Sequence, residues 1–393
     1  MRNIHLVWLT AIWLPSTFGI HHMKKAPLHW VNKRASDVSL VVTNYCAEDI
    51  YPGIQTQAGT APDSQGFLLE AGGSTRKQTV SADWQGRIWG RTNCSFNDDG
   101  TTPANGIAGK ACTTGDCGGT VVCQGTGEVP ATLAEFTLES GSGQTYYDIS
   151  LVDGYNIPLG IISLLGTSGN STLTDIPPNL TNPMCVGTAS QLSAQGNDSA
   201  TEFGTNSTYP IPLAQGITFD EVQEWCPWPL QQDPPSKPGD GVYPYPDDNI
   251  KRPFFDPCLS ACAKWGKAEY CCTGSHDSPS KCQPSEYSTQ AKKVCPDAYS
   301  YAYDDQTSTF IIPSGGGFEV VFCPSGSSST ILTTFSSQLS ELASTGEVTT
   351  QMLADTQNLT LIRSDANTQT GEPNKSLLAA VVILAFAIGM SNW

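Results

Sequence analysis

Short apolar, β-branched and aromatic runs recur between Val38 and Phe322, each bounded by Gly, Pro, Asn or Asp. Evenly spaced runs of this kind are typical of the strands of an all-β sandwich. Because strand pattern flanks both Cys46 near the start and Cys323 at the end, we expect the sheet to close with its last strand. The pattern predicts a mainly β fold with strands at residues 38–43, 66–69, 87–90, 134–138, 146–152, 309–312 and 318–322.

Two polar regions interrupt the strand pattern. The first, Gly160 to Cys226, is rich in Ser, Thr, Asn and Pro, which predicts an exposed loop. The second runs from Pro229 to Pro257, and the cysteine-rich segment 258–295 that follows is predicted to hold one short helix at 259–270. Sequons for N-glycosylation, which require exposed backbone when used, lie at Asn170, Asn179, Asn197, Asn206 and Asn358.

The composition changes after Pro324, where Ser, Thr and small residues dominate. The helical pattern in this region is weak and confined to Leu339–Leu342. Residues 326–364 are therefore predicted to form an extended stalk of the kind that carries O-linked glycans. The folded head is expected to span about residues 35–325.

The first 34 residues have the features of a leader. Residues 1–19 combine an early Arg2, an apolar stretch and small residues, which predicts a signal peptide; the alternative is a short membrane anchor. Residues 20–34 are basic and end in Lys33-Arg34. This dibasic pair is either a processing site or the end of a basic arm that stays attached.

At the other end, Leu377 to Met390 is almost continuously apolar. Small residues near Ser364 and a polar spacer precede it, which predicts that residues 365–393 are a glycosylphosphatidylinositol (GPI) attachment signal that is removed. The alternative is a short C-terminal anchor, although the run is shorter than the roughly 20 residues that span a bilayer. We expect an extracellular, cell-surface or cell-wall protein that contacts membrane only through a lipid.

The cysteines and the charge agree with this location. The chain has 14 cysteines, and an even number in an exported chain predicts disulfides rather than metal sites. We expect no metal and no cofactor. The formal net charge of −17 repels phosphate backbones, which excludes nucleic acid as a partner, while a neutral polysaccharide remains compatible.

Four motifs occur in order within one segment: GRIWGRT at 86–92, CTTGDCGG at 112–119, TLAEF at 132–136 and DISLVDGYN at 148–156. This run resembles the signature half of the thaumatin-like proteins, the family of thaumatin, osmotin and related pathogenesis proteins. The resemblance implies a monomeric β-sandwich with disulfide-rich loop regions and an acidic cleft. By analogy, the anchor signal and the stalk suggest a fungal-type member.

The resemblance also implies the disulfide pairing. The family usually carries one more bridge than these cysteines can form, and both halves of that bridge are missing here. The seven bridges expected are Cys46–Cys323, Cys94–Cys112, Cys117–Cys123, Cys185–Cys295, Cys226–Cys258, Cys262–Cys271 and Cys272–Cys282.

In the family, an arginine, a glutamate and three aspartates line the cleft. The matching residues are Arg87, Glu135, Asp148, Asp153 and either Asp304 or Asp305. On a regular strand Asp148 lies on the face opposite Ile149. Asp153 has the other parity, but the turn signal Asp153-Gly154 lets it swing back beside Asp148.

Such a cluster suits glycoside hydrolysis, which needs one protonated and one ionised carboxyl group. We expect Glu135 to be the general acid and Asp148 or Asp153 the base or nucleophile, with Arg87 and Asp304 or Asp305 in the substrate-binding cleft. Family members range from β-1,3-glucan hydrolases to proteins that only bind. Three functions therefore stay open: a weak endo-β-1,3-glucanase, a β-glucan-binding or antifungal-type wall protein, and a structural glycosylated wall component.

Several other conspicuous residues have structural explanations. Asp116 lies between Gly and Cys in a predicted turn, and Trp84 and Trp89 are expected to pack in the core. Four aromatic residues could stack on sugar rings or belong to the core. They are Phe136, Tyr155, Tyr301 and Tyr303.

Overall fold

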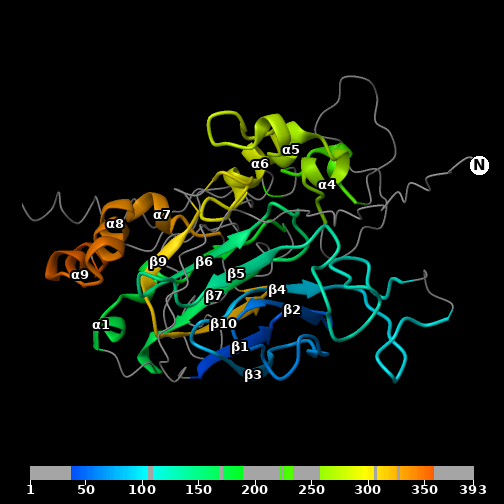
Figure 1. The fold of residues 1–393 in the computed structure, drawn as a ribbon, viewed down its shortest axis with the longest axis horizontal. Helices are drawn as coiled ribbons and strands as arrows, with labels where there is room; N and C mark the ends of the chain where they lie inside the picture. The colour runs from blue at the N-terminus through cyan, green and yellow to red at the C-terminus, as the bar shows by residue number, and fades with distance from the viewer. Residues whose placement is uncertain are drawn as a thin grey trace, which may run out of the picture.

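The structure is a computed structural model that describes residues 37–104, 109–167, 171–188, 222, 225–232, 257–304, 308–324 and 328–357. Two five-stranded sheets form its centre, in the orders β3-β1-β10-β7-β8 and β2-β4-β5-β6-β9 (Figure 1). The strands are β1 (Val38–Asn44), β2 (Tyr51–Ala58), β3 (Ser74–Val80), β4 (Gln85–Arg91), β5 (Leu133–Thr137), β6 (Gln144–Ser150), β7 (Leu159–Leu164), β8 (Met184–Cys185), β9 (Phe310–Pro313) and β10 (Gly317–Phe322).

Helices are short and lie outside the sheets (Figure 1). The α-helices are α1 (Ser171–Thr174), α4 (Ala261–Trp265), α5 (Ala268–Cys271), α6 (Glu286–Val294), α7 (Ile331–Thr334), α8 (Ser336–Thr345) and α9 (Thr350–Gln357). In the part of the chain that the structure describes, single 3-10 turns occur at Leu165–Thr167, Pro178–Leu180, Trp228–Leu230 and Gly274–His276.

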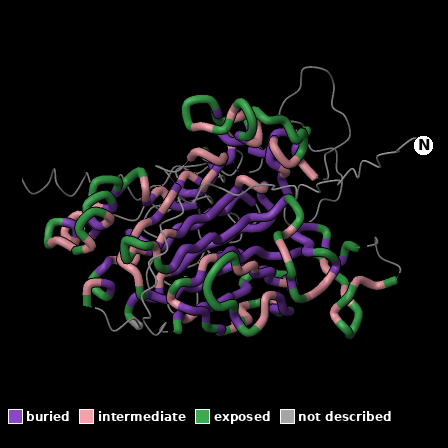
Figure 2. The backbone as a smooth tube through the Cα atoms, viewed as in Figure 1, coloured by how far each residue is buried: buried purple, intermediate pink, exposed green. Residues whose placement is uncertain are grey.

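The mainly β fold is confirmed, and its core lies between the two sheets, where the strands are buried (Figure 2). Phe318 of β10 meets Phe136 of β5 and Tyr147 of β6 at ring-centroid distances of 5.1 and 5.0 Å. Aromatic rings at such distances contribute beyond their buried area. These contacts join the sheets at the centre of the sandwich.

The predicted strands are found except at 66–69, which makes only isolated bridges. The apolar pattern did not predict β2, β3, β7 and β8. β3 is a polar edge strand, β2 contains Pro52 and Gly53, and β7 and β8 lie inside the region that looked like a loop. The expectation of one exposed loop from Gly160 to Cys226 is therefore wrong for residues 160–167 and 171–188, where residues such as Ile161 and Leu173 are buried.

The first and last strands lie side by side. β1 pairs with β10 in parallel, from Leu40 opposite Phe318 to Asn44 opposite Phe322. Cys46–Cys323 then joins residues 277 positions apart just beyond the paired ends. A cross-link that closes so long a loop strongly restricts the unfolded chain.

All seven expected disulfides are present, and the structure contains no free cysteine among the described residues. Three of them, Cys226–Cys258, Cys262–Cys271 and Cys272–Cys282, lie in the helical region of α4–α6. The single helix expected at 259–270 is two helices, because Gly266 adopts a left-handed conformation that ends α4. α6 was not predicted.

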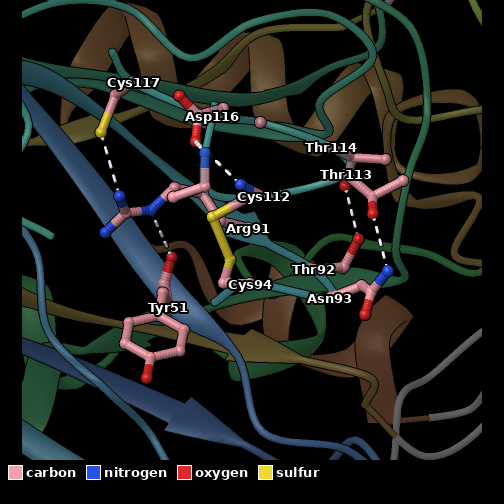
Figure 3. Close-up of a disulfide and its surroundings, with 12 residues drawn as sticks. Tyr51, Arg91, Thr92, Asn93, Cys94, Cys112, Thr113, Thr114, Asp116 and Cys117 are labelled. Carbon is pink, nitrogen blue, oxygen red and sulfur yellow. Dashed lines mark hydrogen bonds between the residues drawn. A yellow bond between two sulfur atoms is a disulfide. The ribbon is translucent and has the colours of Figure 1, made fainter. Parts of the chain in front are cut away.

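Residues 92–104 and 109–132 connect β4 to β5 and are cross-linked by Cys94–Cys112 and Cys117–Cys123. Arg91 at the end of β4 is completely buried, and its guanidinium donates to the carbonyl of Tyr51 (Figure 3). It also donates to the carbonyls of Thr120 and Val121. Burial lowers the pKa of Arg91 to about 10, against the raising effect of Asp116. Arg91 thus ties the disulfide-bonded loop to the sheet.

Asp116 has the structural role that its turn predicted. Its carboxylate accepts from the backbone N–H groups of Ala111 and Cys112 through Oδ2 and from that of Gly119 through Oδ1, at 2.7–2.9 Å. Trp84 and Trp89 are fully buried, and Trp89 donates from Nε1 to the Gly115 carbonyl. These three residues are therefore part of the framework.

Residues 331–357 differ from the extended stalk that the composition suggested. They form α7–α9, and the helices lie beside β9, at one end of the sandwich (Figure 1). Apolar residues are few but correctly spaced: Ile331, Phe335, Leu339 and Leu342 are buried against the main core. Asp297 secures the start of α7 by accepting from Ser329 Oγ and from the backbone N–H groups of Ile331 and Leu332.

Several predictions fall outside the described residues. They concern the signal peptide, the basic segment, the attachment signal, Asp305 and the sequons at Asn170, Asn197, Asn206 and Asn358. Asn179 is described, is half-buried and donates from Nδ2 to the Thr356 carbonyl at 3.0 Å. No helix within the described ranges is long and apolar enough to cross a membrane.

Replacing Asp116 by Asn should lower the free energy of unfolding by about 2 kcal/mol, because one carboxylate oxygen that accepts from backbone N–H groups is lost. Chemical denaturation measures this difference. The exposed Asp98→Asn is the matched control and should unfold like the wild type. Equal stability of the two variants would contradict the framework role.

Phe335→Ala should lower the free energy of unfolding by about 3 kcal/mol, because Phe335 is 2% exposed and fills the contact between the C-terminal helices and the core. Ser340→Ala, on the exposed face of α8, should have little effect. An extended stalk predicts no effect for either variant, so denaturation curves separate the two descriptions.

Candidate functional site

Three of the expected cleft residues stand opposite one another on adjacent strands. Arg87 of β4 pairs in register with Glu135 of β5, and Glu135 pairs with Asp148 of β6. Directly opposite residues on neighbouring strands point to the same face of a sheet, with Cβ atoms about 5 Å apart. We call Arg87, Glu135 and Asp148 the acidic row.

The neighbours of the acidic row fix the face on which it lies. Ile88, Ala134 and Ile149 form the next row across the same strands, and all three are buried in the core between the sheets. Because side chains alternate along a strand, the acidic row points to the outer face. Gln55 of β2 pairs with Arg87 and extends the row by one strand.

The guanidinium of Arg87 lies between two carboxylates. Its Nη2 is 3.4 Å from Glu135 Oε1, and its Nη1 is 3.9 Å from Asp153 Oδ2. Within the described structure, the buried Arg87 Nε has no hydrogen-bond partner. One cation therefore offsets the charge of at least two acids.

The acids differ in their access to solvent. Glu135 and Asp148 are 8% and 6% exposed as residues, whereas the side chain of Asp153 is 34% exposed. The residues of the acidic row are therefore nearly buried, and Asp153 is the most exposed of these three acids.

A tight turn brings Asp153 back to the row, as its sequence predicted. Gly154 donates from its backbone N–H to the Leu151 carbonyl, and its φ of 99° lies in the left-handed region. A Cβ at Gly154 would lie 2.5 Å from the Cys258 carbonyl oxygen, so the turn requires glycine. The backbone carbonyl of Asp153 in addition accepts from the N–H of Ala131.

Asp304 lies on a loop that flanks Asp148. The chain pairs with β6 at Tyr299, opposite Ser150, and again at Phe310, opposite Tyr147, so the loop leaves and rejoins the sheet on either side of Asp148. Asp304 Oδ2 is 3.1 Å from Lys292 Nζ and accepts from Ser300. Burial lowers the pKa of Lys292, and Asp304 opposes this effect.

The four candidate stacking residues divide into two pairs. Phe136 and Tyr155 are 1% and 0% exposed and belong to the core, so they cannot receive a sugar ring. Tyr301 and Tyr303, on the loop that carries Asp304, are half-buried and stay candidates. Among the described residues, no group of three or more His, Cys, Asp or Glu could hold a metal ion.

Comparison with known proteins identifies the family. The family model described as the thaumatin family matches residues 44–324. The chain belongs to the thaumatin family. This thaumatin-family chain is 34% identical over 286 residues to thaumatin-like protein 1 of Pyrus pyrifolia. The aligned region covers 72% of the chain and 89% of that protein.

Two further relatives extend the comparison of this thaumatin-family chain. Pathogenesis-related protein 5 of Arabidopsis thaliana is 36% identical over 324 residues, covering 82% of the chain and 99% of that protein. A protein of Prunus avium named glucan endo-1,3-beta-glucosidase is 32% identical over 284 residues, covering 72% and 88%. The family match ends before α7–α9, so these helices lie beyond it.

Arg87→Met should lower the free energy of unfolding by about 3 kcal/mol, because it leaves nearly buried carboxylates without their cation. Lys110→Met is the matched control, since Lys110 pairs with Glu128 where both side chains are 44% exposed, and it should cost less than about 1 kcal/mol. Denaturation at neutral pH measures both values. Equal losses would show that Arg87 does not hold the row together.

Proposed function

We propose that this protein acts on cell-wall β-1,3-glucan as a weak endo-β-1,3-glucanase. The observation that carries the proposal is the juxtaposition of Glu135 and Asp148 on one outer face, with Arg87 reaching from Glu135 to Asp153. Hydrolysis of a glycosidic bond needs two carboxyl groups on one surface, and this sheet supplies a rigid support for them.

We assign the role of general acid to Glu135. Its carboxyl group is nearly buried and lies directly opposite Asp148 in the row. From this position it would protonate the leaving oxygen of the scissile bond.

We assign the role of base to Asp153 rather than to Asp148. A base that activates water must reach water, and the Asp153 side chain is more exposed than the Asp148 residue. Its Oδ2 lies 3.9 Å from Arg87 Nη1. Asp148, which lies opposite Glu135, would place a second carboxyl group beside the general acid.

The relative from Prunus avium, named glucan endo-1,3-beta-glucosidase, supports the choice of substrate. The negative charge of the chain supports it too, because a neutral polysaccharide meets no repulsion at an acidic surface. Attachment to the outer cell surface through a lipid, a fungal wall setting and a monomeric state are parts of the same proposal.

Binding without cleavage is the second candidate function. The observation in its favour is the depth of the acidic row, since a scissile bond must come within hydrogen-bond distance of Glu135, which is only 8% exposed. In this case the more exposed Asp153 would bind hydroxyl groups of a glucan chain and leave it intact.

Glu135→Gln tests the proposal. Release of reducing sugar from soluble β-1,3-glucan should fall by at least about 100-fold, because an amide cannot donate the proton, while pull-down on insoluble glucan should persist. Asp153→Asn should reduce release by a similar factor. Glu139→Gln, an exposed glutamate two residues beyond β5, is the matched control.

Wild-type binding with no release above the Glu135→Gln background would favour the second candidate. If the wild type neither binds β-1,3-glucan nor releases sugar from it, the structural role in the wall is the one that remains. Release that persists in Glu135→Gln would remove Glu135 as the acid.

A further inference from the structure

A pocket of about 340 Å³ lies apart from the acidic row, in the helical region of α4–α6. Its walls come from three segments of the chain. The lining residues are Pro227, Pro229 and Leu230, then Ala261, Trp265 and Tyr270, and finally Ser285, Glu286 and Tyr287. None of them belongs to the site described above.

Disulfides hold this pocket in shape before any ligand arrives. Cys226–Cys258 fixes the first segment at its start, and Cys262–Cys271 closes the short loop that carries Trp265 and Tyr270. The backbone N–H of Leu259 donates to the Leu230 carbonyl and joins the two walls. A preformed pocket binds a ligand without the entropic cost of ordering its own walls.

Trp265 is the most unusual residue of the pocket. It is 45% exposed, whereas Trp84, Trp89 and Trp225 are buried. α4 begins at Ser260, whose Oγ accepts from the Ala263 N–H, and ends at the left-handed Gly266, so Trp265 is held at the surface at the end of its helix. A large exposed aromatic residue at the edge of a pocket is typical of a binding site.

A second ring extends the aromatic surface. Tyr270 lies with its ring centroid 5.4 Å from that of Trp265, at an interplanar angle of 45°. Two aromatic rings inclined in this way form an apolar surface on which the C–H face of a pyranose ring can pack. The exposed Glu286 carboxylate at the rim can accept hydrogen bonds from sugar hydroxyl groups.

The wall formed by Tyr287 connects the pocket to the acidic residues. Tyr287 is 2% exposed, its ring packs on Trp225, and its hydroxyl donates to the Leu151 carbonyl at 2.6 Å. Burial raises the pKa of Tyr287, and the negative charge of Asp153 raises it further. Asp153 and the wall of the pocket are thus within electrostatic reach of each other.

We propose that this pocket is a second carbohydrate-binding site, which holds one neutral sugar unit of a polysaccharide on Trp265 and Tyr270. The identity of that polysaccharide, a β-1,3-glucan, rests on the proposed function. One glucan chain then occupies both sites, so that the pocket anchors the polymer while its next units reach the acidic row.

Pull-down of the secreted full chain on insoluble β-1,3-glucan tests this site. Trp265→Ala should weaken binding by about tenfold or more, as expected when a central aromatic contact is removed. Trp265→Phe, which keeps an aromatic face, should restore most of the binding. The matched control is Tyr45→Ala, which removes an aromatic residue that is 42% exposed. Tyr45 follows β1, in the sheet that does not carry the acidic row.

The two sites can fail separately in this experiment. Binding that is lost in Trp265→Ala but persists in Arg87→Met supports the pocket even if no sugar is released by the wild type. Binding that is lost in Arg87→Met but is unchanged in Trp265→Ala overturns the pocket and leaves the acidic row. Equal binding by Trp265→Ala and Tyr45→Ala overturns the pocket, and a wild type that does not bind glucan overturns both. Near-ultraviolet circular dichroism checks that each variant is folded.

Discussion

The register of three adjacent strands is the constraint on which the site depends. When β4, β5 and β6 pair with Arg87, Glu135 and Asp148 in line, the residues next to them, Ile88, Ala134 and Ile149, necessarily face the core. A slip of one residue would bury charge and expose the apolar row. The hydrophobic core therefore positions the acids, and the same packing that stabilises the fold assembles the site.

Cross-links extend this rigidity to the surroundings of the sheet. The loop after β4 is tied down by Arg91 and by the backbone contacts of Asp116, and the region of α4–α6 is closed by disulfides. The turn at Gly154 fits against Cys258 of that region, so Asp153 is positioned by the helical region as well as by the sheet. Carboxylates gathered on a nearly buried surface lower the stability of the fold unless they are held at fixed distances from a cation. Here that cation is Arg87.

The sequence predicted the features that local signals encode. Alternation identified the face of Asp148, the Asp-Gly pair identified the turn of Asp153, and the family resemblance supplied the cysteine pairs. Features that depend on distant segments were not predictable. The depth of Glu135 and the pocket at Trp265 are set by segments far apart in the chain. Helices α7–α9 were missed because five buried apolar residues within a Ser/Thr-rich segment are enough to dock them. β3 was missed because an edge strand can remain polar.

The central claim is that the outer face carrying Glu135 and Asp148 meets the glucan chain. Titration of the carboxyl-¹³C-labelled protein with a short β-1,3-gluco-oligosaccharide, followed by NMR, tests it most directly. The account predicts that the carboxyl signals of Glu135, Asp148 and Asp153 shift together with saturation, while that of the exposed Glu139 stays unchanged. Saturable binding that leaves all three signals in place would contradict it.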